Sequence, residues 1–265
     1  MGSEHRQLYN RGIYHNLPTF DPSITKLSAI VTGANGISGF HTMRALLQSP
    51  QRWSTIYALS RRPPPEEMMA LLPSDQRARV KHVACDFLES PKTIAKALLE
   101  AKAAATHVFF YSYFQPKRTP GAISSNPDEL VKVNGALLEN FLNALPLAKI
   151  TPNRILLQTG AKHYGMHIGR VRTPCVESDP QPKHLEPNFY YRQEATLFDF
   201  CKANPGTSWN VIRPAWILGA VKNAQMNALH PFAIYAAVQA KKNEPLFFPS
   251  DWDSWQDECC HSSVS

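Results

Sequence analysis

The sequence predicts an α/β protein built on a doubly wound parallel sheet. Short apolar segments that are typical of buried strands alternate along the chain with amphipathic segments that are typical of helices. The first of these strands, 29–32, ends in Gly33, Gly36 and Gly39, and a helical pattern with one apolar face follows at once. Because each strand returns to the same sheet through a crossover, we expect a parallel sheet of about six strands. The sequence therefore indicates a Rossmann-type fold with helices on both faces.

Length and composition favour one large domain. The chain has 265 residues, of which 43% are hydrophobic, and a domain of this size buries about 70 to 75% of its unfolded surface. We expect three parts: a polar, irregular N-terminal arm over 1–27, the Rossmann domain over 28–219, and a partial substrate or lid region over 220–265.

Charge and cysteine content exclude several classes of function. The net charge is +7, but the basic residues form no run of five or more, so we expect a phosphate-bearing cofactor rather than a nucleic-acid partner. The five cysteines fit no zinc spacing and the polar N-terminus has no signal-peptide core, which favours a cytoplasmic protein without a metal site. No apolar run approaches the ~18 residues that cross a bilayer, so we expect no membrane association.

The glycine-rich turn predicts a dinucleotide site. Glycines allow the backbone to turn sharply and to approach a pyrophosphate, and the N-terminus of the following helix offers unpaired N–H groups and a partial positive charge. The residues of this turn that we assign to the cofactor are Thr32, Gly33, Asn35, Gly36, Ile37 and Gly39. The alternative is an ordinary strand-to-helix turn with a glycine cap.

The end of the second predicted strand, 55–60, indicates which dinucleotide binds. An acidic residue at this point hydrogen-bonds the ribose hydroxyl in NAD-binding proteins, whereas arginine pairs with the 2′-phosphate of NADP. Here the acid is absent and Ser60 is followed by Arg61 and Arg62. The pattern therefore favours NADP, and the alternative is a solvated basic turn.

The remaining elements continue the alternation of strands and helices. The expected strands are 80–85, 106–111, 154–158 and 208–213, and the expected helices are 92–103, 126–145 and 188–203. Ligands of such sheets bind at the carboxyl ends of the strands. The further residues that these ends assign to the cofactor are Asp86, Phe87, Tyr111, Thr159, Pro214 and Ile217.

A tyrosine hydroxyl is the natural proton donor for a reduction in this fold, and a nearby cation lowers its pKa from about 10. Short-chain dehydrogenases place a lysine four residues after the tyrosine, but Glu194 stands four after Tyr190, and we expect its carboxylate to raise the pKa of Tyr190. Lys162, from the neighbouring strand end, is the available cation. The alternatives are a solvated loop lysine and a core aromatic, and we expect His163 and Tyr164 to be structural.

Several motifs together resemble the progesterone 5-beta-reductase and iridoid synthase-like (PRISE) family, an atypical branch of the extended short-chain dehydrogenases. The resemblance runs from about Ala29 to Trp255. The motifs are Thr32-Gly33-x-x-Gly36-x-x-Gly39, Ser60-Arg61-Arg62-Pro63, Cys85-Asp86, Thr106-His107-Val108-Phe109, Leu157-Gln158-Thr159-Gly160-x-Lys162-His163-Tyr164, Asn188-Phe189-Tyr190-Tyr191 and Arg213-Pro214.

The resemblance implies an NADP-dependent oxidoreductase of specialised metabolism that reduces the C=C bond of an enone or enal by 1,4-addition. Lys162 and Tyr190 then hold the enolate oxygen, where negative charge develops. Asn134 matches a helix asparagine that supports the site through backbone or water contacts, the alternative being an exposed helix residue. The implied partners are a small hydrophobic carbonyl-conjugated substrate and, as an open alternative, a second copy of the chain in a homodimer.

Two departures from the family pattern leave other functions open. The segment 165–187 looks shorter than its family counterpart, and the family continues beyond the point that corresponds to Ser265, so we expect 220–265 to form a small, truncated substrate region. Hydride transfer relies on the exclusion of water and on substrate positioning, so we expect a truncated substrate region to impair catalysis more than cofactor binding. The alternatives are a carbonyl reductase of the same fold and a non-redox NADP-binding homologue that acts as a scaffold, sensor or cyclase.

Overall fold

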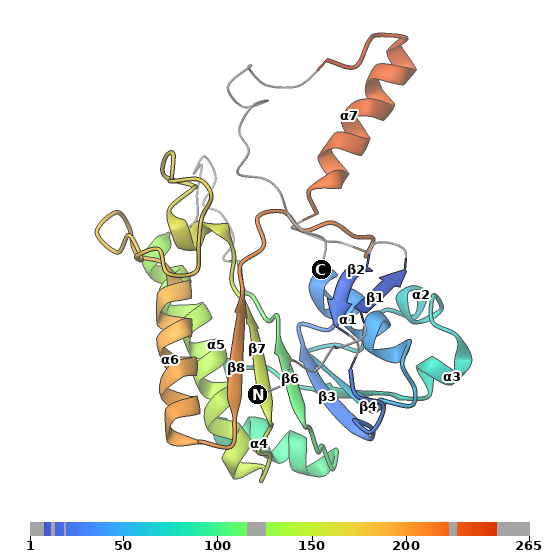
Figure 1. Cartoon of the computed structure of the whole chain (residues 1–265), viewed down its shortest axis with the longest axis vertical. Helices are drawn as coiled ribbons and strands as arrows, with labels where there is room; N and C mark the ends of the chain where they lie inside the picture. Colours follow the sequence, from blue (N-terminus) through green and yellow to red (C-terminus); the bar gives the residue numbers. More distant parts are fainter. Residues whose placement is uncertain (1–7, 12–13, 19, 116–125, 223–226, 248–265) are drawn as a thin grey trace.

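A computed structural model of the chain describes residues 8–11, 14–18, 20–115, 126–222 and 227–247 and contains one parallel sheet of six strands (Figure 1). The strand order is β5-β4-β3-β6-β7-β8, so the chain reverses its direction of winding between β3 and β6. This order is that of the Rossmann fold, whose ligands bind where the winding reverses. The strands are β3 (Leu27–Thr32), β4 (Trp53–Ser60), β5 (Val80–Ala84), β6 (His107–Phe110), β7 (Arg154–Gln158) and β8 (Ser208–Ile212).

Helices cover both faces of the sheet, as the alternation predicted. The helices are α1 (Ile37–Leu47), α2 (Glu66–Met69), α3 (Ser74–Arg77), α4 (Pro91–Glu100), α5 (Pro127–Leu147), α6 (Phe189–Ala203) and α7 (Leu229–Lys242), with a short 3₁₀ helix η1 (Ala161–Tyr164). Strand β3 is buried on both sides. Ile30 belongs to the core cluster that includes residues of α4, α5 and α6, whereas Ala29 and Val31 belong to the cluster that includes residues of α1. Such double burial explains why the central strands are continuous apolar runs. The predicted fold class is confirmed.

The helix starts follow from capping side chains. Asn126 caps α5, since its Oδ1 accepts a hydrogen bond from the Asp128 N–H at 3.0 Å, and Pro127 occupies the first helical position. Asn188 caps α6 by accepting from the Tyr190 N–H at 3.0 Å. A capping residue lies outside the helix proper, so α5 and α6 each begin one residue later than the sequence analysis placed them.

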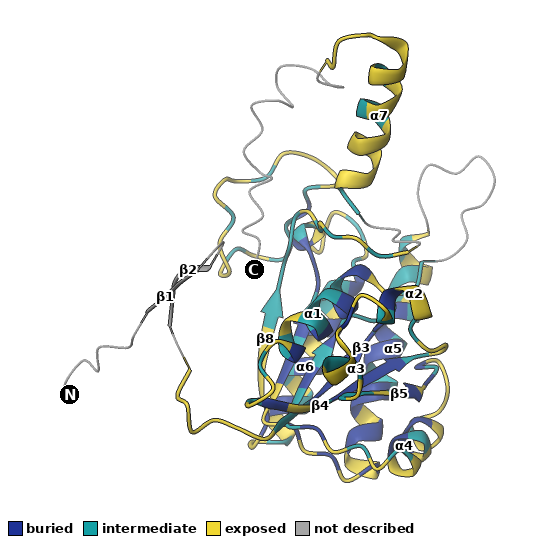
Figure 2. Cartoon of the chain, turned by 90° about the vertical axis from the view of Figure 1, so that its right-hand side faces the viewer, coloured by how far each residue is buried: buried dark blue, intermediate teal, exposed yellow. Residues whose placement is uncertain are grey.

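Parts of the chain outside the sheet differ from the predictions. The N-terminal arm was expected to be irregular, but β1 (Leu8–Arg11) and β2 (Tyr14–Pro18) pair as antiparallel strands. The short helices α2 and α3, each preceded by a proline, were not predicted. In the region 220–265, helix α7 extends away from the sheet and none of its residues is buried (Figures 1 and 2). Residues 248–265 of this region lie outside the described residues.

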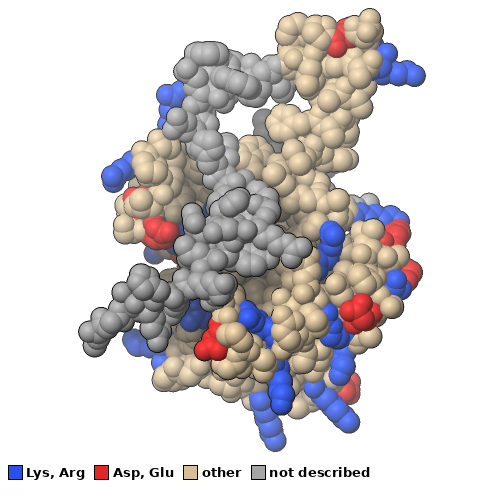
Figure 3. Space-filling model, turned by 45° about the vertical axis from the view of Figure 1, so that its right-hand side comes forward, with Lys and Arg blue, Asp and Glu red and all other residues tan. Residues whose placement is uncertain are grey.

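Basic and acidic side chains are interspersed over the face of the molecule that Figure 3 shows. This distribution agrees with the scattered basic residues of the sequence. Among the described residues, the helices are too short or too polar to cross a bilayer.

Candidate cofactor and catalytic site

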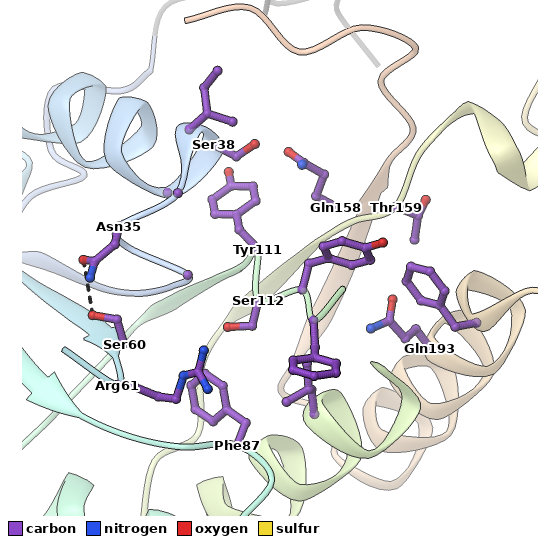
Figure 4. A pocket seen from close by; sticks show the side chains of 18 of the residues that line it. Asn35, Ser38, Ser60, Arg61, Phe87, Tyr111, Ser112, Gln158, Thr159 and Gln193 are labelled. Carbon is purple, nitrogen blue, oxygen red and sulfur yellow. Dashed lines mark hydrogen bonds between the residues drawn. The ribbon is translucent and has the colours of Figure 1, made fainter. Parts of the chain in front are cut away.

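A cavity of about 770 Å³ lies at the carboxyl ends of the strands, where the sheet reverses its winding. Its size is typical of ligand sites. Figure 4 shows Asn35, Ser60 and Arg61 on one side of it and Thr159 and Gln193 on the other. The predicted site residues that line the cavity are Gly33, Asn35, Gly36, Ile37, Gly39, Ser60, Arg61, Arg62, Asp86, Phe87, Tyr111, Thr159, Lys162, Tyr190 and Ile217.

The glycine turn has no room for a Cβ atom at Gly33 or Gly39. Gly33 has φ of 60°, and a Cβ atom there would lie 2.9 Å from the carbonyl oxygen of Tyr111. A Cβ on Gly39 would lie 2.4 Å from the carbonyl oxygen of Gly33. Gly36 stands at the N-cap of α1, where no side chain caps the helix. The first residues of α1 line the cavity and their N–H groups have no capping side chain, which fits a dinucleotide pyrophosphate.

Side chains at the end of β4 fix the backbone of the arginine pair. The Asn35 amide donates to the carbonyl oxygen of Arg62 at 2.8 Å, and the Ser60 hydroxyl donates to the same oxygen at 2.7 Å. The side chains of Arg61 and Arg62 are exposed and line the cavity. Guanidinium groups recognise phosphate through charge-assisted hydrogen bonds, so this corner fits a 2′-phosphate. Asn35 belongs to the glycine turn, but its side chain also holds the backbone of the arginine pair in place.

Two predicted cofactor residues, Thr32 and Pro214, do not line the cavity. Thr32 is fully buried, and its hydroxyl accepts hydrogen bonds from the Tyr111 and Ser112 N–H groups at 3.0 and 3.1 Å. The carbonyl oxygen of Pro214 accepts from the Ala161 N–H at 3.1 Å. Both residues therefore join neighbouring strand ends and shape the site from behind.

Tyr190 and Lys162 reach the same cavity from different elements. Tyr190 lies in the first turn of α6 and Lys162 in η1, directly after β7. The Tyr190 hydroxyl rests over Gly160, where a Cβ atom would lie 3.0 Å from it. Asn188 links the two elements, because its amide donates to the carbonyl oxygen of Lys162 at 2.9 Å while its Oδ1 caps α6.

The Tyr190 hydroxyl is a neutral hydrogen-bond donor at neutral pH. Burial, followed by the nearby Tyr113, raises the pKa of Tyr190 well above its usual range. The sequence analysis attributed such a rise to Glu194, and this cause is wrong, because the Glu194 carboxylate is directed to His163 and Arg213 instead. Helical spacing brings residues i and i+4 to one face, but it does not fix where a long side chain ends.

An aromatic wall closes one side of the cavity. Tyr113 follows β6, and its ring lies 5.7 Å from that of Phe189 at the start of α6. Asn134 of α5 holds the neighbouring Phe114, since its side chain accepts from the Phe114 N–H at 2.8 Å and donates to the Phe114 carbonyl at 2.9 Å. Asn134 is fully buried, so the alternative of an exposed helix residue is wrong. Its contact with the backbone agrees with the role that the family resemblance implied.

Gln193 is a cavity residue that the sequence analysis missed. It lies one helical turn after Tyr190 and is buried, and its amide donates to the carbonyl oxygen of Asn134 at 2.9 Å. The three-residue spacing from Tyr190 was a usable signal, because residues i and i+3 share a helix face. The other lining residues that were not assigned to the site are Ser38, Cys85, Leu88, Ser112, Tyr113, Phe114, Leu130, Leu137, Gln158 and Phe189. In the part of the chain that the structure describes, no cluster of histidine, cysteine or acidic residues suits a metal ion.

The strand order, the glycine turn and the cavity at the winding reversal define the class: a Rossmann-fold protein with a ligand cavity at the carboxyl ends of its strands. A family model described as a PRISE-like Rossmann-fold domain matches residues 29–265. The chain belongs to this family. The resemblance predicted from the motifs is confirmed.

Three of the similar proteins are named for their activities. The chain is 31% identical to the short chain dehydrogenase gsfE of Penicillium aethiopicum, 29% identical to an (S)-8-oxocitronellyl enol synthase of Camptotheca acuminata and 28% identical to a 3-oxo-Delta(4,5)-steroid 5-beta-reductase of Arabidopsis thaliana. The matches cover 86%, 89% and 86% of the chain, but only 57%, 57% and 56% of these relatives. The chain thus spans little more than half of their length.

Solved structures support the fold. The UDP-Glc/GlcNAc 4-epimerase of Campylobacter jejuni superposes with a TM-score of 0.58 at 17% identity, over 83% of this chain and 63% of the epimerase. A similarity at this level of identity concerns the arrangement of the sheet and helices alone.

Proposed function

We propose that the protein is an NADPH-dependent reductase of the activated C=C bond of an enone or enal. The observation that carries the proposal is the convergence of Lys162 and Tyr190 on the cavity that also contains the glycine turn. The activities for which the enol synthase and steroid reductase relatives are named support the same chemistry. The aromatic wall favours a small hydrophobic substrate with a conjugated carbonyl group.

The roles of the residues follow from charge and position. NADPH, when bound, would supply the hydride to the β-carbon, and solvent would supply the proton that the α-carbon of the enolate takes up. The neutral Tyr190 hydroxyl donates a hydrogen bond to the substrate carbonyl oxygen, and the Lys162 ammonium stabilises the negative charge that develops on it. Each donor placed at a developing oxyanion lowers the barrier by about 2.7 to 4 kcal/mol. Tyr113 and Phe189 exclude water on one side and pack against the apolar part of the substrate.

Product analysis tests the reaction. The purified chain is incubated with NADPH and a panel of small enals and enones, and the products are identified by gas chromatography with mass spectrometry. We expect the saturated carbonyl compound. An allylic alcohol would indicate reduction of the carbonyl group instead, and the absence of NADPH oxidation with every compound would contradict a reductase.

Replacing Arg61 with Ala tests the cofactor preference. We expect the Kd for NADPH to rise about 10- to 100-fold, because a hydrogen bond to a charged group contributes about 1.5 to 3 kcal/mol. The Kd for NADH is expected to stay within about twofold, since NADH lacks the phosphate. Both values are measured by fluorescence titration of the reduced cofactor.

Arg154→Ala is the matched control for Arg61→Ala. Arg154 is also exposed, but it begins β7, so it lies at the amino ends of the strands, opposite to the cavity. It pairs with Asn210 at 2.9 Å. Arg154→Ala removes one positive charge, as Arg61→Ala does, and leaves the cavity intact. An unchanged preference for NADPH in Arg61→Ala would show that this arginine does not select the cofactor.

A further inference from the structure

A buried carboxylate lies behind the proposed catalytic pair. Glu194 of α6 has 2% of its side chain exposed, and its Oε1 lies 3.1 Å from Nδ1 of His163, which is 1% exposed. This contact has the distance of an ion pair but not the alignment of a hydrogen bond. The Arg213 guanidinium donates to Oε1 at 3.3 Å, and the Gln181 amide donates to Oε2 at 3.1 Å.

The charge on Glu194 is maintained by its neighbours. Burial raises the pKa of the Glu194 carboxyl, but His163 and the Arg213 guanidinium outweigh burial and hold that pKa below its usual range. A buried ion without its partner is strongly destabilising. The ion pairs therefore hold the side chains of Glu194, His163 and Arg213 in fixed positions relative to one another.

The three side chains belong to the elements that surround the catalytic pair. His163 directly follows Lys162 in η1, Glu194 lies one helical turn after Tyr190 in α6, and Arg213 directly follows β8. The cluster thus links the turn that carries Lys162 to the helix that carries Tyr190. None of the three residues lines the cavity.

Further contacts hold the His163 side of the cluster. The Tyr191 hydroxyl donates to the carbonyl oxygen of His163 at 2.8 Å, and the rings of Tyr164 and Tyr191 pack edge-on against the imidazole at 5.0 and 5.4 Å. The Arg213 guanidinium also donates to the Tyr164 hydroxyl at 3.1 Å. The turn after β7 is consequently attached to α6 and β8 by both backbone and side-chain contacts.

We infer that Glu194, His163 and Arg213 form a positioning network that fixes the turn carrying Lys162 against the helix carrying Tyr190. The structural part of this inference concerns the turn itself, and its catalytic consequence rests on the proposed reductase function. The three residues do not touch the substrate. They set the direction from which the ammonium and the phenol approach the carbonyl oxygen, and reactions are sensitive to misplacement of about 1 Å.

Hydrogen exchange of the full chain without cofactor tests the structural part. The variant Glu194→Gln keeps the shape of the side chain and removes its charge. The backbone amides of Ala161, His163 and Gly165 donate to the carbonyl oxygens of Pro214, Gly160 and Lys162. We expect these three amides to exchange about tenfold faster in this variant. Glu139→Gln is the matched control. Glu139 of α5 pairs with Arg192 of α6 at 2.7 Å, away from the cavity, so this variant should exchange like the wild type.

His163→Phe is a second variant in case Glu194→Gln does not fold. It keeps an aromatic ring between Tyr164 and Tyr191 and removes both imidazole nitrogens, including the Nδ1 that faces Glu194. Faster exchange of the same amides is expected here too. Unchanged exchange in the variants that fold would overturn the network.

Steady-state kinetics test the catalytic part. We expect kcat of Glu194→Gln, calculated per NADPH-binding site counted by fluorescence titration, to fall about tenfold or more with an unchanged KM for NADPH. Counting the binding-competent sites removes the contribution of unfolded protein, which would also lower the apparent kcat at constant KM. Faster exchange with an unchanged kcat would overturn the positioning role. Faster exchange together with an inactive wild-type chain would support the network as a structural constraint and contradict the proposed reductase function.

Discussion

Tyr190→Phe is expected to lower kcat for enone reduction by about 10²- to 10³-fold, the usual effect of removing one donor to a developing oxyanion. The substitution removes a single oxygen and keeps the ring that packs against Phe189 at 4.5 Å between centroids. The KM for NADPH should change little, because the glycine and arginine turns bind the cofactor elsewhere in the cavity. Steady-state kinetics at saturating NADPH provide both values.

The control for this variant is Tyr57→Phe. The Tyr57 hydroxyl donates to the carbonyl oxygen of Lys102 at 3.2 Å and lies outside the cavity, so its loss should leave kcat unchanged. A Tyr190→Phe enzyme with wild-type kcat would show that the hydroxyl is not the donor. If Lys162→Ala also retained full activity, the reductase site that we propose would not be in use.

The sheet could be predicted from sequence because its signals are local. The run from Ala29 to Val31 is apolar at every position, which a strand buried on both faces requires. Asn126 and Asn188 mark helix starts through hydrogen bonds to residues two or three positions away. In each case the residues that decide the structure are neighbours in the chain. The glycine turn belongs to the same group, since its tight contacts join Gly33 and Gly39.

The supporting contacts of the site could not be predicted in the same way. Glu194 was judged by its distance from Tyr190 along one helix, yet its partners His163 and Arg213 come from two other elements. Thr32 was assigned to the cofactor from its place in a motif, but its hydroxyl accepts hydrogen bonds from Tyr111 and Ser112, which follow β6 and lie far away in sequence. Such side-chain directions depend on tertiary packing, which a single sequence does not display.

Gly39→Ala tests the glycine turn and should weaken both the fold and cofactor binding. The added Cβ atom would lie 2.4 Å from the carbonyl oxygen of Gly33 and 2.9 Å from Cα of Ala34, so backbone rather than a flexible side chain has to move. Overpacking costs about 1 to 3 kcal/mol, which for a domain of this size lowers Tm by about 2 to 10 °C. Differential scanning fluorimetry without cofactor measures this change.

The same displacement should raise the Kd for NADPH about 100-fold, because it moves the N-terminus of α1 away from the pyrophosphate and lost hydrogen bonds to a charged group cost about 1.5 to 3 kcal/mol each. Gly206→Ala is the control, since a Cβ atom there meets no atom within 4 Å. Wild-type affinity in a folded Gly39→Ala protein would mean that the pyrophosphate does not bind at this turn. The cofactor would then have to be held from the arginine side of the cavity, where Asn35 and Ser60 fix the carbonyl of Arg62.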